Sequence, residues 1–204
     1  PSAVRAGLAA IESGFTKYTA AHGIPELRKA LGPWIKEDTG VTYTENEIVV
    51  GSGAKFVLAA ALQMLVNPGD EVLIPAPYWV SYPVMAELAG GVPKIIDCGE
   101  AEGFKLTPAK LEAAITPKTR VLILCSPSNP TGIAYTRDEL AALGKVLLKN
   151  PNVTLISDDI YNRLMLDGSH IAPHILNVVP ELRDQMMIVN GASKSFSMTG
   201  WRIG

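Results

Sequence analysis

Short apolar runs alternate along the chain with longer amphipathic stretches, and this alternation is the strongest constraint on the fold. Several runs are apolar at nearly every position, which is typical of strands covered on both faces. We therefore predict an α/β fold with a mostly parallel sheet and helices on both faces. The predicted strands are 48–50, 71–75, 92–96, 120–125, 153–157 and 187–189. The predicted helices are 4–13, 24–38, 54–66, 81–89, 107–115 and 137–149.

Composition narrows the class of protein. The chain has 204 residues, with 18 Lys+Arg against 20 Asp+Glu, so a net charge of -2 argues against nucleic acid or an anionic membrane as partner. No apolar window is long enough to span a membrane. The two cysteines form no CxxC pair, and Pro173 interrupts the only close histidine pair, so we predict no metal site. This composition fits a cytoplasmic α/β protein.

The segment Gly51-Ser52-Gly53-Ala54-Lys55 connects a predicted strand to a predicted helix. Backbone N–H groups at such a helix start bind phosphate, and glycine lets a ligand approach closely. Phe56 stands where a dinucleotide fingerprint has its third glycine, and the P-loop signature is absent. A plain turn is therefore an equal alternative. A dehydrogenase is another alternative, because Asp70 or Glu71 lies about 20 positions onward, where a ribose-binding acid would be.

Polar residues follow the other predicted strands, where ligands bind in parallel sheets. Asp158 and Asp159 follow the 153–157 run, and their side chains point in opposite directions if the strand continues, so only one would face a site. Lys194 lies among small residues after the last run. Taken singly, Trp79 after the 71–75 run fits a core position, and Lys194 fits a surface lysine. Asn129 lies between two prolines in a stiff loop.

Together these segments resemble one family. Residues 191–204 resemble the pyridoxal-phosphate attachment signature of class I aminotransferases, and residues 126–132 resemble the asparagine loop of that family. Residues 157–161 are similar to its Asp-Glu-Ile-Tyr element, with Asp159 in place of glutamate. Residues 77–82 and 17–28 are similar to the bacterial aspartate aminotransferase subgroup that includes aspartate/prephenate enzymes. The resemblance spans essentially the whole chain and implies the large domain of a fold-type I enzyme dependent on pyridoxal 5'-phosphate.

The resemblance implies catalytic roles. Lys194 would hold the cofactor covalently and move a proton as general base. Asp158 would pair with the pyridinium nitrogen and keep it protonated. Tyr161 and Asn129 would hydrogen-bond the ring hydroxyl oxygen, and Trp79 would stack on the ring.

It also implies how phosphate and substrate are bound. Arg202 and the Gly53-Ala54-Lys55 helix start would bind the phosphate, and Tyr18 would reach the phosphate of a neighbouring subunit in a homodimer. Trp79, Asn129 and Lys55 would contact substrate, and Lys55 favours an acidic one. Many relatives have a phosphate-binding serine where this chain has Gly191, which makes Ser193 a candidate substitute.

The implied function is transfer of the amino group of aspartate, or a related dicarboxylic amino acid, to 2-oxoglutarate. An aromatic or alanine aminotransferase, a carbon–sulfur lyase and an inactive fragment are the alternatives. Residues 1–204 would form part of the large domain. An N-terminal segment and a C-terminal small domain would lie outside them. We therefore expect little or no transaminase activity from these residues alone.

Overall fold

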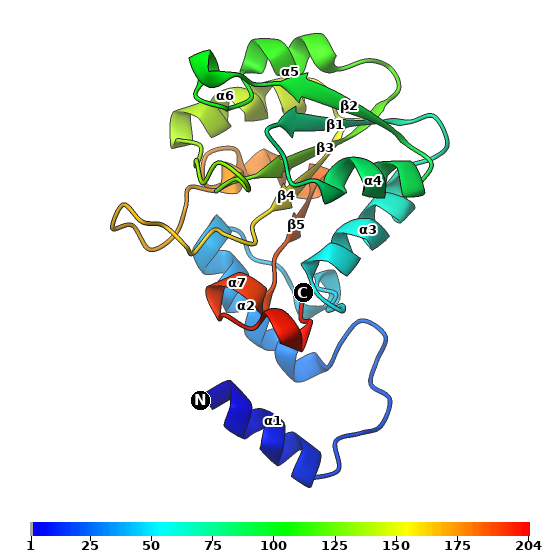
Figure 1. The fold of residues 1–204 in the computed structure, drawn as a ribbon, viewed down its shortest axis with the longest axis vertical. Coiled ribbons are helices and arrows are strands. Elements are labelled where there is room, and N and C mark those ends of the chain that lie inside the picture. Colours follow the sequence, from blue (N-terminus) through cyan, green and yellow to red (C-terminus); the bar gives the residue numbers. More distant parts are fainter. Residues whose placement is uncertain (1) are drawn as a thin grey trace.

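A parallel sheet forms the centre of the molecule in the computed structural model, which describes residues 2–204 (Figure 1). Within those residues the sheet has five strands in the order β2-β1-β3-β4-β5, and every neighbouring pair is parallel. The strands are β1 (Glu71–Ala76), β2 (Val92–Asp97), β3 (Thr119–Cys125), β4 (Thr154–Asp158) and β5 (Met186–Val189). The predicted α/β fold is confirmed.

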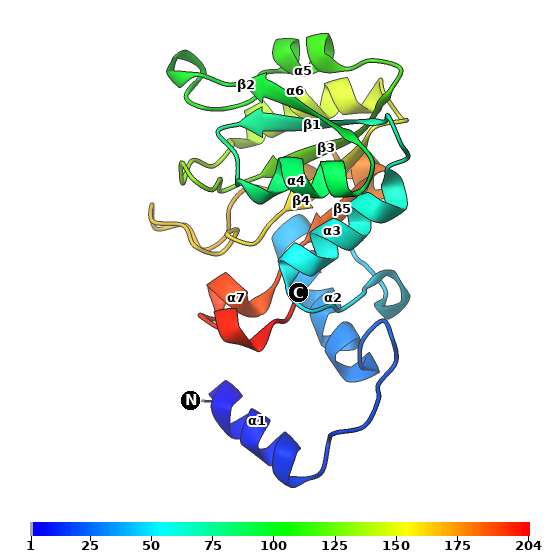
Figure 2. The ribbon, with the colours of Figure 1, turned by 45° about the vertical axis from the view of Figure 1, so that its right-hand side comes forward.

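Helices cover both faces of this sheet (Figures 1 and 2). Because side chains alternate along a strand, Leu73, Leu122 and Leu155 join the core on the α5 and α6 side. Their neighbours Val72 and Val121 join a second core on the α3 and α4 side. The helices are α1 (Ser2–Glu12), α2 (Pro25–Thr39), α3 (Ala54–Leu65), α4 (Ser81–Leu88), α5 (Pro108–Ala114), α6 (Arg137–Leu148) and α7 (Ala192–Ser195).

Local signals in the sequence set several helix boundaries. Thr107 caps α5, because its Oγ1 accepts the Lys110 backbone N–H at 3.3 Å and Pro108 occupies the first turn. At the start of α6, Thr136 and Glu139 form a reciprocal capping box. These caps fix the residue at which each helix begins. No helix of residues 2–204 is both long and apolar enough to cross a membrane.

The order of the strands creates an opening between β1 and β3. The chain passes from β1 through α4 to β2 on one side, and then returns through α5 to β3 on the other side of β1. The connections after β1 and β3 therefore diverge at the carboxyl end of the sheet. Ligand crevices of open parallel sheets form at such a reversal.

The predicted strand at 48–50 is wrong. These residues are extended but join no strand of the sheet, and the preceding Glu45–Glu47 forms a 3₁₀ turn. Their apolar, β-branched character fits a strand, but a strand also needs a partner along its length. Here Val50 donates its N–H to His22 O at 3.0 Å, and Gly51 exchanges two backbone hydrogen bonds with Gly204.

A buried polar cluster attaches α2 to the loop after β4. Asp38 of α2 is 5% exposed and accepts hydrogen bonds from Asn162 Nδ2 at 2.7 Å and Arg163 Nε at 2.9 Å. The Arg163 guanidinium also lies 3.6 Å from the centre of the Trp34 ring. Asn162 and Arg163 thus attach the loop after β4 to α2. By contrast, α1 buries no residue of its own.

Candidate functional site

A cavity of about 380 Å³ opens at the carboxyl end of the sheet, beside the reversal between β1 and β3. It collects side chains from α3, from the loops after β1, β3 and β4, and from the segment around α7. Most of the predicted site residues line it, namely Ala54, Lys55, Trp79, Asn129, Asp158, Tyr161, Lys194 and Arg202. Segments far apart in sequence therefore meet at one site, as their shared position at strand ends predicted.

Asp158, the last residue of β4, is a buried residue whose side chain lines this cavity. It is 3% exposed, and its Oδ2 accepts a 2.6 Å hydrogen bond from Tyr82 Oη. Burial raises the pKa of Asp158 to about 6, although the Tyr82 hydrogen bond opposes that rise. None of the ion pairs formed within residues 2–204 includes it. A buried anion without a cationic partner is suited to a cationic ligand.

Asp159 points the other way, as the alternation of the strand predicted. Its carboxylate accepts a 2.6 Å hydrogen bond from Ser157 Oγ, lies 3.3 Å from His174 Nε2 and does not line the cavity. Full burial raises the pKa of Asp159 to about 7, and burial lowers the pKa of His174 to about 4. Only one of the two adjacent carboxylates therefore faces the cavity. No group of three or more metal-ligating side chains occurs in residues 2–204.

Lys194 and two polar side chains form the next part of the cavity wall. Lys194 is half-buried in α7, and its Nζ lies 5.8 Å from the centre of the Tyr161 ring. The Tyr161 hydroxyl lies 3.5 Å from Asn129 Nδ2, at the limit of a hydrogen bond. Burial raises the pKa of Tyr161, so its hydroxyl stays protonated at neutral pH. An amine and two hydrogen-bonding groups thus face the same space as Asp158.

The start of α3 and Arg202 form a cradle suited to a phosphate group. Gly53 precedes α3 with a φ of 90°, a conformation that only glycine adopts readily. Any side chain at this position would place a Cβ atom on the Arg202 guanidinium. Arg202 is held there by hydrogen bonds to the backbone oxygens of Thr199 at 3.0 Å and Ser52 at 3.4 Å. Unpaired N–H groups at the helix start and a guanidinium are both phosphate donors. The residues present therefore fit pyridoxal phosphate.

Trp79 and the exposed Lys55 also line the cavity. Lys55 Nζ lies 4.8 Å from the centre of the Trp79 ring, and the ring meets Tyr82 edge-on with centroids 5.5 Å apart. The Trp79 ring thus contacts both Lys55 and Tyr82. Ser193, the candidate substitute for the missing serine, is buried and also lines the cavity. Tyr18 does not line the cavity and is fully exposed.

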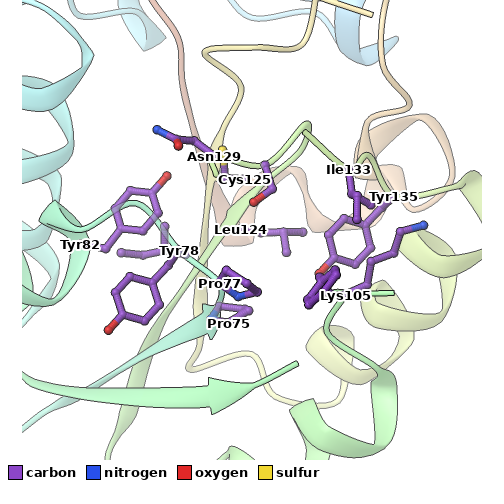
Figure 3. A pocket seen from close by; sticks show the side chains of 13 residues that line it. Pro75, Pro77, Tyr78, Tyr82, Lys105, Leu124, Cys125, Asn129, Ile133 and Tyr135 are labelled. Carbon is purple, nitrogen blue, oxygen red and sulfur yellow. The ribbon is translucent and has the colours of Figure 1, made fainter. Parts of the chain in front are cut away.

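Tyr82 is a site residue to which the sequence alone assigned no role. Its signal was weak but present: Tyr82, Met85 and Ala86 form the buried face of α4, and a tyrosine on such a face needs a hydrogen-bond partner. Tyr82 also borders a second cavity of only about 20 Å³, toward Leu124 and Tyr135 (Figure 3). That space fits about one water molecule, so the larger cavity is the candidate site.

Comparisons with known proteins agree with this geometry. A family model described as aminotransferase class I and II matches residues 1–204. The chain is 52% identical over 195 residues to the aspartate/prephenate aminotransferase of Cereibacter sphaeroides, covering 96% of this chain and 48% of that protein. It is 46% identical over 200 residues to the aspartate aminotransferase of Bacillus sp. YM-2, covering 98% and 50%. The chain spans about half the length of the curated relatives it matches.

Solved structures share the fold. The aspartate aminotransferase of Rhizobium meliloti superposes with a TM-score of 0.96 at 45% identity, covering all of this chain and 51% of that one. The aspartate aminotransferase of Thermus thermophilus with maleate gives 0.90 at 42% identity, covering 98% and 51%. The family model, these relatives and the arrangement of the cavity lead to one assignment: the chain belongs to the class I and II aminotransferase family.

Proposed function

We propose that this chain forms the cofactor-binding part of a pyridoxal-phosphate-dependent aspartate aminotransferase. The observation that carries the proposal is that an unpaired buried carboxylate, a lysine amine and a phosphate cradle face one cavity. Asp158, Lys194 and the pair of Gly53 with Arg202 provide these three elements. Pyridoxal phosphate has a basic ring nitrogen, an aldehyde and a phosphate, which match them one to one.

Each cavity residue has a distinct task in transamination. Asp158 would hold a proton on the ring nitrogen, because its carboxylate is buried and forms no ion pair within residues 2–204. Lys194 would hold the cofactor through its amine, and that same amine would act as the general base that takes the proton from the substrate Cα. Tyr161 and Asn129 bind the ring hydroxyl oxygen, and Arg202 binds the phosphate. The bound cofactor supplies an electron sink for the negative charge that develops at Cα.

The proposed substrates are aspartate, or a related dicarboxylic amino acid, and 2-oxoglutarate. Lys55 supports this choice, because it is an exposed cation that lines the cavity beside Trp79, where it would attract a second carboxylate. The curated relatives at about half identity are named for aspartate. Those relatives are twice as long, so we propose that residues outside this chain complete the substrate site. We also propose a homodimer in which Tyr18 serves the partner subunit.

A borohydride trap tests the proposal directly. The 204-residue chain and a longer protein that contains it are each incubated with pyridoxal phosphate, reduced, digested and analysed by tandem mass spectrometry. We expect a phosphopyridoxyl adduct at Lys194, because that amine faces the cavity beside the phosphate cradle. Adducts scattered over surface lysines in both proteins would contradict the proposed function.

Gly53→Ala is expected to weaken cofactor binding. The added methyl group would lie 2.7 Å from Arg202 Cζ and displace the guanidinium from the helix start. We expect the dissociation constant for pyridoxamine phosphate, which binds without a covalent bond to Lys194, to rise about tenfold or more, since a lost charge-assisted contact contributes roughly 1.5–3 kcal/mol. Fluorescence titration of the bound cofactor measures this change.

Gly69→Ala is the matched control for that variant. Gly69 has the same φ of 90°, but nothing lies within 4 Å of its Cβ position, and it precedes β1 at the far end of the sheet. Both variants carry a similar backbone strain, of about 1–3 kcal/mol. Equal cofactor affinities in the two variants would show that the cradle around Gly53 does not bind phosphate.

A further inference from the structure

Tyr82 is a buried side chain that contacts two elements of the proposed cofactor site. It lies in the first turn of α4 and is 3% exposed. Its hydroxyl donates a 2.6 Å hydrogen bond to Asp158 Oδ2, across 76 residues of sequence. Its ring meets Trp79 at an interplanar angle of 89°. One side chain thus supports both the carboxylate and the indole at the cavity wall.

The hydrogen bond fixes how the Asp158 carboxylate is turned. Oδ2 accepts from Tyr82, and Oδ1 accepts a longer bond of 3.4 Å from the Ile160 backbone N–H. An ionised carboxylate only accepts, so the phenol hydrogen has to point at Asp158. Without that donor, the weak bond from Ile160 would be the remaining one, and the carboxylate could rotate about its last torsion. The Tyr82 hydroxyl is therefore the main restraint on its orientation.

We propose that Tyr82 is the positioning residue for Asp158, orienting its carboxylate and keeping it ionised for the protonated ring nitrogen of pyridoxal phosphate. This inference rests on the proposed function. The hydrogen bond lowers the pKa of Asp158 against the effect of burial, so removing the hydroxyl raises that pKa further toward neutrality. The other ionisable groups that act on Asp158 or share its cavity are Cys125 of β3, Tyr161, Lys194, Lys55 and Arg202, with Asp159 adjacent in sequence but turned away from the cavity.

Tyr135 provides a matched control on the other side of the small cavity (Figure 3). It is 5% exposed, and its hydroxyl makes one short hydrogen bond of 2.7 Å, accepting the Leu106 backbone N–H. It does not line the cofactor cavity. Tyr135→Phe and Tyr82→Phe each remove one oxygen atom and one buried hydrogen bond. A difference between them in cofactor binding therefore reports on Asp158 and not on general loss of stability.

The experiment titrates both variants and the parent with pyridoxamine phosphate from about pH 5 to about pH 8, in whichever form of the protein gives the Lys194 adduct. For Tyr82→Phe we expect the dissociation constant at neutral pH to rise about ten- to hundredfold. We also expect the acid-side pH at which affinity is half lost to move upward. Tyr135→Phe should match the parent in both measurements.

Each outcome decides the inference separately from the function. A parent that binds cofactor while Tyr82→Phe behaves like Tyr135→Phe overturns the role of Tyr82 and leaves the proposed function intact. If Tyr82→Phe fails to fold, the double variant Tyr82→Phe/Asp158→Asn decides. Recovery of folding supports the inference, because the amide removes the unsupported charge. A double variant that also fails to fold overturns it in favour of a purely structural role.

Discussion

In a longer protein that contains this chain, Lys194→Ala is expected to abolish the covalent cofactor adduct and to reduce transamination by about 10²–10⁴-fold or more, the usual contribution of a positioned general base. The reason is chemical: Lys194 supplies the only amine within α7, and its Nζ lies over Tyr161 on the cavity wall. Because one side chain both holds the cofactor and moves the proton, its loss removes two functions together. Borohydride trapping and the rate with aspartate and 2-oxoglutarate measure them independently.

Two further variants serve as controls. One tests whether a positive charge at position 194 is enough, and the other tests whether loss of any lysine has the same effect. Lys194→Arg keeps the positive charge, but a guanidinium does not serve as nucleophile or base at neutral pH, so it should be as inactive as alanine. Lys118→Ala removes an exposed lysine at the opposite, amino end of β3 and should retain parental activity and labelling. An adduct that persists in Lys194→Ala, or activity that Lys194→Arg preserves, would refute the assignment of the lysine.

The sheet was predictable because its strands carry their signal locally. The run 120–125 became Thr119–Cys125, and the period of two along a strand was enough to place Asp158 and Asp159 on opposite sides. The same reasoning failed at 48–50. Apolar β-branched residues indicate that a segment tends to be extended, but sheet membership depends on a partner elsewhere in the chain. Here Val50 bonds to His22, and it is the following Gly51 that bonds to Gly204.

The candidate site was predictable in its residues but not in its contacts. Parallel strands place their carboxyl ends at one edge, so Trp79, Asn129, Asp158 and Lys194 had to lie near one another. The bond between Tyr82 and Asp158 was not predictable, since it depends on how α4 packs on the sheet. The same holds for the close approach of the Arg202 guanidinium to Gly53, which joins residues from distant parts of the chain.

Asp158→Asn is expected to lower the affinity for the cofactor and to raise the stability of the cofactor-free protein. In the cofactor-free protein the buried carboxylate is destabilising: a pKa raised from 3.8 to about 6 corresponds to roughly 3 kcal/mol above pH 6. The unfolded chain ionises near pH 3.8 and the folded one only near pH 6. The penalty is therefore absent below the first value, grows between the two, and is complete above the second. Asparagine avoids this penalty and still accepts the Tyr82 hydrogen bond.

The stability gain of Asp158→Asn should thus be near zero at about pH 4 and largest above pH 6, as urea unfolding of the cofactor-free protein would show. Its affinity for pyridoxamine phosphate should fall about ten- to hundredfold, because the ring nitrogen loses an ionised partner. Asp159→Asn is the matched control: its carboxylate is equally buried but faces His174, so cofactor affinity should remain at the parental value. If both variants lose affinity equally, burial near the strand end, and not the charge facing the cavity, determines binding. A carboxylate that costs stability in the empty protein and is needed only when the cofactor is bound is the signature of a functional group.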